Sequence, residues 1–285
     1  MKCPYCVSQR PRLHVSKPAA EIYRCPECGG GFVHPQMSDE ALSKLYTENY
    51  YRSWGLENKG SATKAMKIAT FNRYLSVLRR YKSGGKILDV GCATGFFLSA
   101  AAAQGFDAYG VELAGYAAEA AGKIAGRNKV YNGRLEDCPF PEREFEAITM
   151  FDLLEHVRAP LLTLAAARRL LKDDGIVLVM TPDIDSLSAR VMGGTWTHYK
   201  AEHLYYFNER AMALTARGSG FELAYAAKAE KTISLEYALG QFAAYPHRLI
   251  SPLLRCAARL LPARLGKIPF SLHMGESLYI LKKSG

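Results

Sequence analysis

Short apolar runs alternate along the chain with stretches of helical periodicity, which is the pattern of an α/β fold. Apolar runs predict buried strands at 86–90, 106–111, 128–132, 145–151, 176–180, 221–227 and 277–281. Between several of them lie alanine-rich or amphipathic stretches, such as 114–125 and 209–217, that predict helices. Strands that alternate with helices build a mostly parallel sheet with helices on both faces. The sequence therefore predicts a doubly wound, Rossmann-like α/β domain with a seven-stranded sheet.

A glycine-bearing turn joins the first predicted strand to the first helix. Asp89 lies near the end of that strand, and Gly91 and Gly95 follow it. Glycine has no Cβ, so the backbone can turn tightly here and a ligand can lie against it. The next strand ends on Glu112, 23 positions after Asp89, where an acid can bind ribose hydroxyls. This register predicts nucleotide binding, and the alternative is a glycine-rich turn in an α/β protein without a nucleotide.

The glycine spacing distinguishes between kinds of nucleotide. Dinucleotide sites carry Gly-x-Gly-x-x-Gly with a helix dipole facing the pyrophosphate, whereas this chain has Gly-x-x-x-Gly preceded by Asp89. A carboxylate repels a pyrophosphate but suits a ligand with an ammonium or sulfonium group. The loop resembles motif I of the class I S-adenosylmethionine-dependent methyltransferases, Asp-x-Gly-x-Gly-x-Gly, with Ala93 replacing the middle glycine. The resemblance implies that S-adenosylmethionine is the cofactor.

The same resemblance implies further cofactor contacts. In that family the loop after the third strand lies along the adenine, which points to Glu136 or Asp137, or to the backbone of Leu135. Asp152 directly follows the fourth strand, and the carboxyl ends of strands are where chemistry collects in open α/β sheets. We therefore expect Asp152 to contact the cofactor as well.

Catalytic candidates follow the same strand. The segment from Asp152 to His156 resembles the acid-x-x-Glu-His segment of the ubiquinone-biosynthesis O-methyltransferases, which implies that Glu155 and His156 hold a divalent cation, with magnesium as the candidate, or that His156 is a base. The alternative is a helix start with Asp152 as N-cap and Glu155 closing a capping box. A second base candidate is His203, in the run 202–207, which resembles a segment of the same broad family. The aromatic residues around it can instead pack against the sheet edge.

Four cysteines near the N-terminus form two Cys-x-x-Cys pairs. Cys3 and Cys6 make the first pair, Cys25 and Cys28 the second, and 18 residues separate the pairs. This spacing is typical of a four-cysteine zinc site, whose metal is structural because four protein ligands leave no open position. A segment of about 35 residues cannot fold on apolar burial alone, so a metal is expected. The alternative is a redox Cys-x-x-Cys.

The division of the chain follows from these motifs. We expect a zinc ribbon over 1–35 and a methyltransferase domain over 36–285, with a helical insert at about 228–276. Within the insert, 249–261 has the pattern of a basic amphipathic helix. Such a helix predicts peripheral membrane contact through 245–267, and the alternative is a lid helix packed on its own domain.

Net charge bears on the partners. The chain of 285 residues carries a net charge of +10, and its flanks hold most of the excess. Residues 1–35 contain five Lys/Arg and two Asp/Glu, and residues 241–285 contain seven and one. Basic flanks predict contact with lipid head groups, nucleic acid or a phosphorylated substrate, or serve solubility alone.

We expect O-methylation of a small-molecule or lipid-linked acceptor, such as a sugar, phenol or quinone precursor. The alternative is an RNA methyltransferase whose zinc ribbon and basic flanks hold RNA. No apolar run approaches the ~18 residues of a membrane span, and the N-terminus lacks the apolar region of a signal peptide. Seven cysteines without a secretion signal suggest metal binding or free thiols. The expected location is therefore cytoplasmic.

Overall fold

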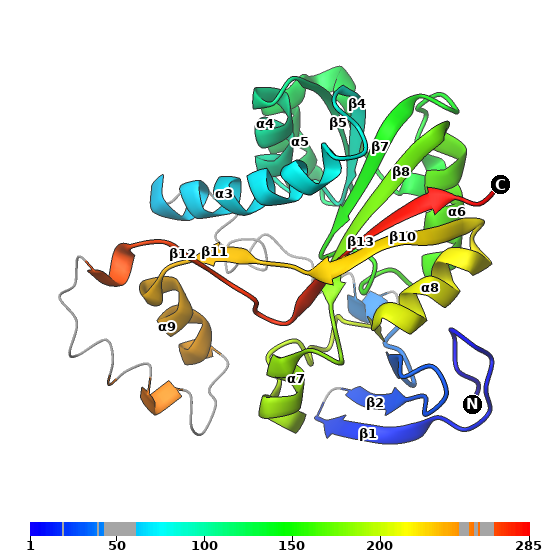
Figure 1. Cartoon of the computed structure of the whole chain (residues 1–285), viewed down its shortest axis with the longest axis vertical. Coiled ribbons are helices and arrows are strands. Elements are labelled where there is room, and N and C mark those ends of the chain that lie inside the picture. Colours follow the sequence, from blue (N-terminus) through cyan, green and yellow to red (C-terminus); the bar gives the residue numbers. More distant parts are fainter. Residues whose placement is uncertain (19, 39, 43–60, 245–250, 254–255, 257–264) are drawn as a thin grey trace.

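A seven-stranded sheet forms the centre of the molecule. The computed structural model describes the whole chain except residues 19, 39, 43–60, 245–250, 254–255 and 257–264. The strands of the sheet are β4 (Gly85–Val90), β5 (Phe106–Glu112), β6 (Val130–Asn132), β7 (Phe145–Phe151), β8 (Leu171–Pro182), β10 (Phe221–Lys228) and β13 (Glu276–Lys283). Their order is β10-β13-β8-β7-β4-β5-β6 (Figure 1), and only the pairs that involve β13 are antiparallel.

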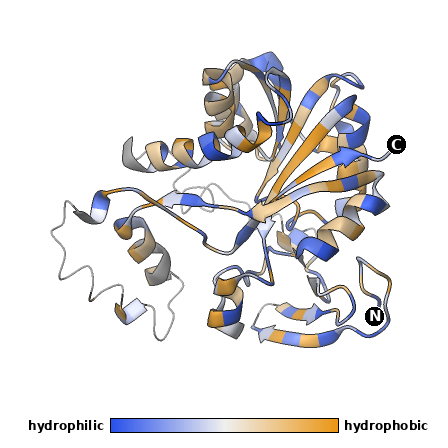
Figure 2. Ribbon diagram, in the orientation of Figure 1, coloured by the Kyte–Doolittle hydropathy of each residue, from blue (hydrophilic) through white to orange (hydrophobic). Residues whose placement is uncertain are grey.

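Helices cover both faces of this sheet. One face carries α3 (Ser61–Leu78), α4 (Phe96–Ala103) and α5 (Gly115–Ala125), and the other carries α6 (Pro160–Leu170) and α8 (Glu209–Gly218). Consecutive strand residues point to opposite faces of the sheet. Ile87 packs with the first group of helices and Leu88 with the second. Strands buried on both faces are nearly continuous apolar runs, and the central strands in Figure 2 are accordingly hydrophobic.

Several predicted boundaries differ from the structure. The third strand begins at Val130 rather than at 128, because a 3-10 helix (η1, Arg127–Lys129) precedes it. The fifth begins at Leu171 rather than Ile176, and its extra residues include an exposed polar run that broke the apolar pattern. No helix begins at Asp152, so the capping-box alternative is wrong. Residues 152–159 form turns, and α6 begins at Pro160, which is preorganised for the first helical position.

The N-terminal residues form a second, smaller sheet. Its strands are β1 (Arg12–Lys17), β2 (Ala20–Arg24), β3 (Gly31–Val33) and β9 (Tyr205–Tyr206) in that order, all antiparallel. β9 lies far from residues 1–35 in the sequence and belongs to the larger domain. Backbone pairing therefore joins the segment 1–35 to that domain. Cys25 and Phe32 lie in the same apolar cluster as Phe207 and Leu281. The division at residues 35 and 36 stays a prediction.

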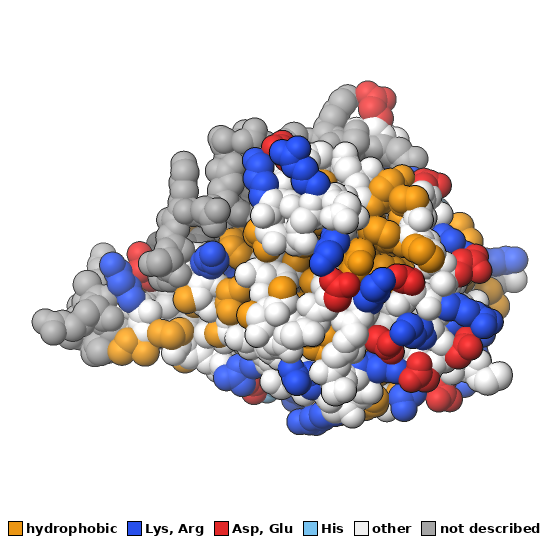
Figure 3. Space-filling view, turned by 90° about the horizontal axis from the view of Figure 1, so that it is seen from above, with side chains coloured by type: hydrophobic (Ala, Val, Ile, Leu, Met, Phe, Trp, Pro, Cys, Tyr) orange, Lys and Arg blue, Asp and Glu red, His pale blue; other side chains and the backbone are white. Residues whose placement is uncertain are grey.

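The insert between β10 and β13 extends away from the sheet in Figure 1. It contains β11 (Lys231–Ile233), α9 (Leu235–Ala244), η4 (Leu265–Lys267) and β12 (Phe270–Leu272), and β11 pairs with β12. The amphipathic helix predicted over 249–261 lies mostly outside the described residues. Among the described helices, none has the length and apolar character needed to cross a bilayer. On the face in Figure 3, acidic and basic side chains are mixed.

Candidate functional site

The loop after β4 has a backbone shape that lets a ligand approach closely. Gly91, Ala93 and Gly95 have φ angles of 76°, 46° and 86°, all in the left-handed region. A Cβ on Gly95 would lie 3.1 Å from the Cα of Ala121, so this glycine also lets α4 approach α5. Ala93 adopts the left-handed conformation at a cost of roughly 1–2 kcal/mol. The loop therefore keeps the predicted turn even where alanine replaces the middle glycine.

Glu112 holds this loop from the end of β5. Its Oε2 accepts a hydrogen bond from the amide of Ala93, and its Oε1 accepts one from Ala114, each at 2.9 Å. The side chain is buried. A carboxylate has about four lone-pair sites, which is more than these two amides use. Ribose binding by Glu112 stays a prediction, and the hydrogen bonds add a loop-shaping role that the sequence did not indicate.

Asp89 lies beneath the loop rather than on its surface. It is 4% exposed and accepts a hydrogen bond from the Thr149 hydroxyl at 2.7 Å. Burial raises the pKa of Asp89 to about 8, and nearby Glu112 adds to the rise while the Thr149 bond opposes it. A cationic ligand group above the loop would favour the ionised carboxylate. The expected electrostatic role in cofactor binding is consistent with this position, and direct contact stays a prediction.

The raised pKa of Asp89 predicts a pH-dependent stability. Its ordinary value is 3.8, and a raised folded-state pKa gives stability that is full below that value and lost as pH rises through about 8. We expect Asp89→Asn to flatten the fall in unfolding free energy over this range, measured by urea denaturation without ligand. Asp107→Asn, which removes a surface pair with Lys129, is the control. Parallel curves for Asp89→Asn and the natural protein would contradict the assignment.

The predicted adenine loop is a short 3-10 helix, η2 (Leu135–Asp137). Leu135 is buried in the larger apolar cluster, so only its backbone can face a ligand. Glu136 reaches α6, where its Oε1 accepts a hydrogen bond from the Thr163 hydroxyl at 2.7 Å. Its other oxygen lies 3.8 Å from Nε of Arg134. Adenine recognition by Leu135 or Glu136 therefore stays a prediction, and the Thr163 contact favours the backbone of Leu135.

The three predicted catalytic side chains meet at the carboxyl edge of β7 and β8. The metal-ligating atoms of Glu155, His156 and His203 all lie within 4.8 Å of one another. The two imidazole rings meet edge to face with centroids 4.6 Å apart. Nε2 of His156 lies 3.9 Å from Oε1 of Glu155, whose Oε2 accepts a hydrogen bond from Thr181 at 2.9 Å. The fold thus brings His203 to the other two residues from a separate loop.

Hydrogen bonding and burial define the proton positions in this cluster. Nδ1 of His156 lies 3.1 Å from the carbonyl oxygen of Glu202. Because a carbonyl only accepts, Nδ1 carries the hydrogen, and Nε2 is the nitrogen that can take a proton. Burial lowers the pKa of His156 to about 4 and that of His203 well below its usual value. Burial, aided by the charge of Asp152, raises the pKa of Glu155 to about 8.

Two atoms of the cluster lack a hydrogen-bond partner within the described residues. They are Oε1 of Glu155 and Nδ1 of His203, and both are buried. Leaving a buried polar group unsatisfied costs about 1–3 kcal/mol, so such atoms mark places where a ligand, water or ion binds. The cluster therefore has the features of a binding site as well as those of a proton-transfer site.

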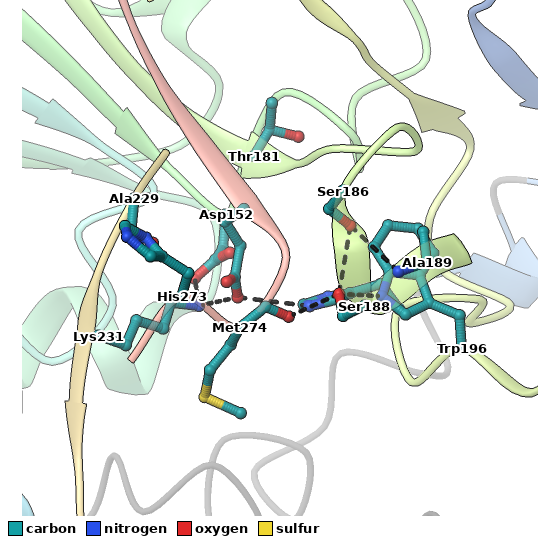
Figure 4. Close-up of polar contacts among 12 residues, drawn as sticks. Asp152, Thr181, Ser186, Ser188, Ala189, Trp196, Ala229, Lys231, His273 and Met274 are labelled. Carbon is teal, nitrogen blue, oxygen red and sulfur yellow. Dashed lines mark hydrogen bonds and ion pairs between the residues drawn. The ribbon is translucent and has the colours of Figure 1, made fainter. Parts of the chain in front are cut away.

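A second charged group includes Asp152 and Lys231, which are labelled in Figure 4. It adjoins the cluster through His198, whose ring centroid lies 6.2 Å from that of His203. Nζ of Lys231, on β11, lies 2.6 Å from Oε1 of Glu276 and 3.3 Å from Oδ2 of Asp152. Nε2 of His198 lies 3.4 Å from the same oxygen of Glu276. Burial disfavours the charge on Lys231, but the two carboxylates outweigh it and raise its pKa well above the usual value. Asp152 is thus paired with the insert, and its predicted cofactor contact stays a prediction.

Sequence reasoning missed Lys231 and Glu276. These residues lie near the two ends of the insert, 45 positions apart, and no short motif contains both. One signal was available for Glu276, which directly precedes an apolar run that becomes the last strand. That strand is antiparallel, so its start pairs with Pro182 at the carboxyl end of β8. A charged residue there lies at the edge where the catalytic candidates lie.

The four N-terminal cysteines also come together. The Sγ atoms of Cys3 and Cys28 lie 3.6 Å apart, as do those of Cys6 and Cys25, and all four lie within 4.8 Å. Four sulfurs bound to zinc at ~2.3 Å in tetrahedral geometry lie about 3.8 Å apart. None of the four forms a disulfide. The donor set and its spacing fit the predicted structural zinc.

A family profile matches the chain over most of the region that carries these residues. The profile describes a methyltransferase domain and matches residues 66–226. The chain belongs to the methyltransferase-domain family. The match includes the glycine loop, Glu112 and all three catalytic candidates, whereas the cysteine site and the insert lie outside it.

Curated relatives of this methyltransferase-domain protein share the same core. The ubiquinone biosynthesis O-methyltransferase of Haemophilus ducreyi is 31% identical over 111 residues, which are 34% of this chain and 45% of the relative. The mitochondrial enzyme of that name from Schizosaccharomyces pombe is 31% identical over 129 residues, 43% of this chain and 45% of the relative. The chain thus spans about half the length of the curated relatives it matches.

Solved methyltransferase structures show the same fold. The Burkholderia thailandensis 1,6-didemethyltoxoflavin-N1-methyltransferase, solved with S-adenosylhomocysteine, superposes with a TM-score of 0.56 at 13% identity, over 96% of this chain and 100% of that one. The Haemonchus contortus phosphoethanolamine N-methyltransferase 2, solved with S-adenosyl-L-methionine, gives 0.51 at 16% identity, over 90% and 62%. These likenesses confirm the predicted class I fold of this methyltransferase-domain protein.

Proposed function

We propose that the protein is an S-adenosylmethionine-dependent methyltransferase that acts on an oxygen atom of a small-molecule or lipid-linked acceptor. Family membership supports the reaction class, and the names of the curated relatives support oxygen as the methylated atom. One observation carries the proposal. A buried, neutral imidazole, that of His156, lies beside Glu155 at the sheet edge to which the glycine loop also belongs.

Methyl transfer to a hydroxyl requires removal of its proton. S-adenosylmethionine, when bound, supplies a methyl group on a positively charged sulfur. As the acceptor oxygen bonds to that carbon, the carbon–sulfur bond breaks, its electron pair stays on sulfur, and the hydroxyl proton must leave. Nε2 of His156 is oriented to take this proton, because the Glu202 carbonyl holds Nδ1 in its protonated form. His203 is the second candidate base, since its ring contacts that of His156.

A divalent cation in the same cluster is the second proposal. Two imidazole nitrogens and one carboxylate oxygen within 4.8 Å can act as three ligands. Imidazoles suit transition metals, whereas Mg²⁺ prefers oxygen ligands, so the ligand set favours a transition metal over the magnesium suggested by family resemblance. Turnover that is lost when a chelator removes metal from the cluster while the four cysteines keep theirs, and that a divalent ion restores, would support this proposal over a metal-free base.

The cofactor site has a direct test in Glu112. We expect Glu112→Ala to weaken S-adenosylhomocysteine binding about ten- to a hundredfold in calorimetry, since a hydrogen bond to a charged group is worth roughly 1.5–3 kcal/mol. Glu119→Ala on α5, which removes a surface pair with Lys123, should leave the affinity unchanged. Glu112→Gln keeps the side-chain shape and should give an intermediate loss. Unchanged binding in Glu112→Ala would mean that the ribose lies elsewhere.

A further inference from the structure

The cysteine-bearing segment is connected to the catalytic cluster by backbone hydrogen bonds. We call residues 1–35 the ribbon. Its last strand, β3, pairs with β9, where Phe32 lies opposite Tyr205. Just beyond this pair, the amide of Val33 donates to the carbonyl of Leu204 at 2.9 Å. The ribbon therefore holds the short segment that directly follows His203.

The same segment is also hydrogen-bonded to the backbone of Glu155. The amides of Leu204 and Tyr205 both donate to the carbonyl oxygen of Glu155, at 2.8 and 3.2 Å. His203 immediately precedes Leu204 in the chain. One short run of backbone is thus bonded to the ribbon on one side and to Glu155 on the other, so it determines where Glu155 and His203 lie relative to each other.

Tyr5 links the metal site to the same run. It lies between the first two cysteines, and its hydroxyl donates to the carbonyl of Gly31 at 2.7 Å and lies 3.3 Å from that of Tyr206. Its ring packs edge to face on Tyr205 and Phe207, with centroids 6.1 and 5.5 Å apart. A side chain that comes from the turn of the first cysteine pair therefore contacts both strands of the ladder.

We propose that the ribbon positions the catalytic residues of the active site. With zinc bound by the four cysteines, β3 holds β9, and β9 fixes Glu155 and His203 in register with His156. About 35 residues bury too little apolar surface of their own to fold without a metal, so metal binding supplies part of the ribbon's folding energy, beside its packing on the larger domain. β9 has two residues and lies at the edge of its sheet, so loss of β3 removes its strand partner.

We expect zinc loss to affect the segment that carries His203 but not the cofactor site. The glycine loop and Glu112 belong to the seven-stranded sheet, whereas the ribbon pairs with β9 in the other sheet. Removal of the metal should therefore release the segment 202–208 and leave cofactor binding in place. The catalytic meaning of this release rests on the proposed function, but the release itself can be measured without any turnover.

Hydrogen–deuterium exchange of the full chain tests this. The natural protein is compared before and after zinc removal by a chelator. We expect amide exchange in 202–208 to rise at least about tenfold, exchange in 86–95 to stay unchanged, and added zinc to reverse the rise. The Kd for S-adenosylhomocysteine should stay within about twofold. Cys25→Ser should behave like the chelated protein, and Cys256→Ser, at an exposed cysteine outside the ribbon, like the natural one.

Tyr5→Phe tests the link itself, because it keeps the ring and removes the hydroxyl. Zinc content should stay at one per chain, while exchange in 202–208 rises and the ring resonances of His203 shift in NMR spectra. Tyr23→Phe, which loses only an exposed bond to Glu21, is the control. Tyr5 is thus a positioning residue.

Three results would overturn the inference. They are unchanged protection of 202–208 after zinc loss, such protection in a protein that is purified reduced without zinc, and a rise in exchange that extends equally to 86–95. If Cys25→Ser does not fold, chelation of the natural protein decides. Failure of the untreated protein to bind S-adenosylhomocysteine would instead contradict the proposed function, and the exchange results would still decide this inference.

Discussion

His156→Ala is expected to lower turnover by about 10²–10⁴-fold, the range for removal of a general base. The reason is the tautomer of His156. Its Nδ1 holds a proton that faces the Glu202 carbonyl, so Nε2, which faces the Glu155 carboxyl group, can receive a proton. Binding of S-adenosylhomocysteine should persist, since the glycine loop lies on other strands. Single-turnover methyl transfer, measured once a screen of sugar, phenol and quinone-precursor acceptors has identified a substrate, provides the rate.

His273→Ala is a matched control for this prediction. His273 has the same local pattern, with Nδ1 3.1 Å from the Ala229 carbonyl and Nε2 3.5 Å from Glu230, but it is half exposed and lies in the insert. Its loss should leave turnover within about twofold of the natural rate. If His203→Ala is the damaging change and His156→Ala is mild, the base is His203. Equal mild effects of both would remove proton transfer to histidine from the mechanism.

Lys231→Met should lower the free energy of unfolding by about 3 kcal/mol at neutral pH. Methionine keeps the apolar length of lysine but leaves Glu276, which is 3% exposed, without the ammonium group 2.6 Å away. Removing one partner of a buried ion pair costs about 3–5 kcal/mol. The lower end applies because the Lys231 side chain is 25% exposed. Urea denaturation of the full chain gives the value.

The pH dependence sharpens this test. The pKa of Lys231 is raised above its ordinary 10.5, so its stabilising contribution is complete below that pH and is lost only as pH rises through the higher folded-state value. The titration of Lys231 therefore adds no pH dependence to the stability difference between about pH 6 and 9. A change within this range would come from Glu155, whose pKa of about 8 Lys231 helps to lower. Lys228→Met, at an exposed position on β10, should change stability by less than about 0.5 kcal/mol. A Lys231→Met variant as stable as this control would show that His198, 3.4 Å from the same oxygen of Glu276, compensates for the lost ammonium group.

Much of the fold was predictable because it is encoded in short sequence windows. Strands covered by helices on both faces must be apolar throughout, so β4, β5 and β7 were placed within a residue of their observed bounds. The early part of β8 was missed because Lys172, Asp173 and Asp174 are exposed there, and an exposed polar run does not differ from a loop by its pattern. Where the end of a strand extends beyond the helices that cover the sheet, its residues are exposed and polar, and no apolar run in the sequence marks it.

The features of the candidate site likewise divide into those that local sequence predicts and those that it does not. The glycine loop, the acid at the end of β5 and the cysteine pairs were predictable, because each follows a local spacing rule. The Lys231–Glu276 pair and the two-residue strand β9 were not, because they depend on tertiary packing between distant segments. Likewise, the sequence indicated that Asp152 is functional, but it did not indicate that Lys231 of the insert pairs with it.

The paired stem of the insert determines how far the rest of the insert can vary without disturbing the sheet. β11 and β12 close the insert just beyond the point where β10 and β13 pair, and Lys231 lies in that stem. The entropy cost of a closed loop grows only slowly with its length, by about 0.6 kcal/mol for each doubling. The residues beyond the stem can therefore lengthen, shorten or be exchanged with little effect on the sheet register. The segment between β11 and β12 can accordingly be exchanged as a unit while the strand pairs that carry Lys231 and Glu276 stay in place.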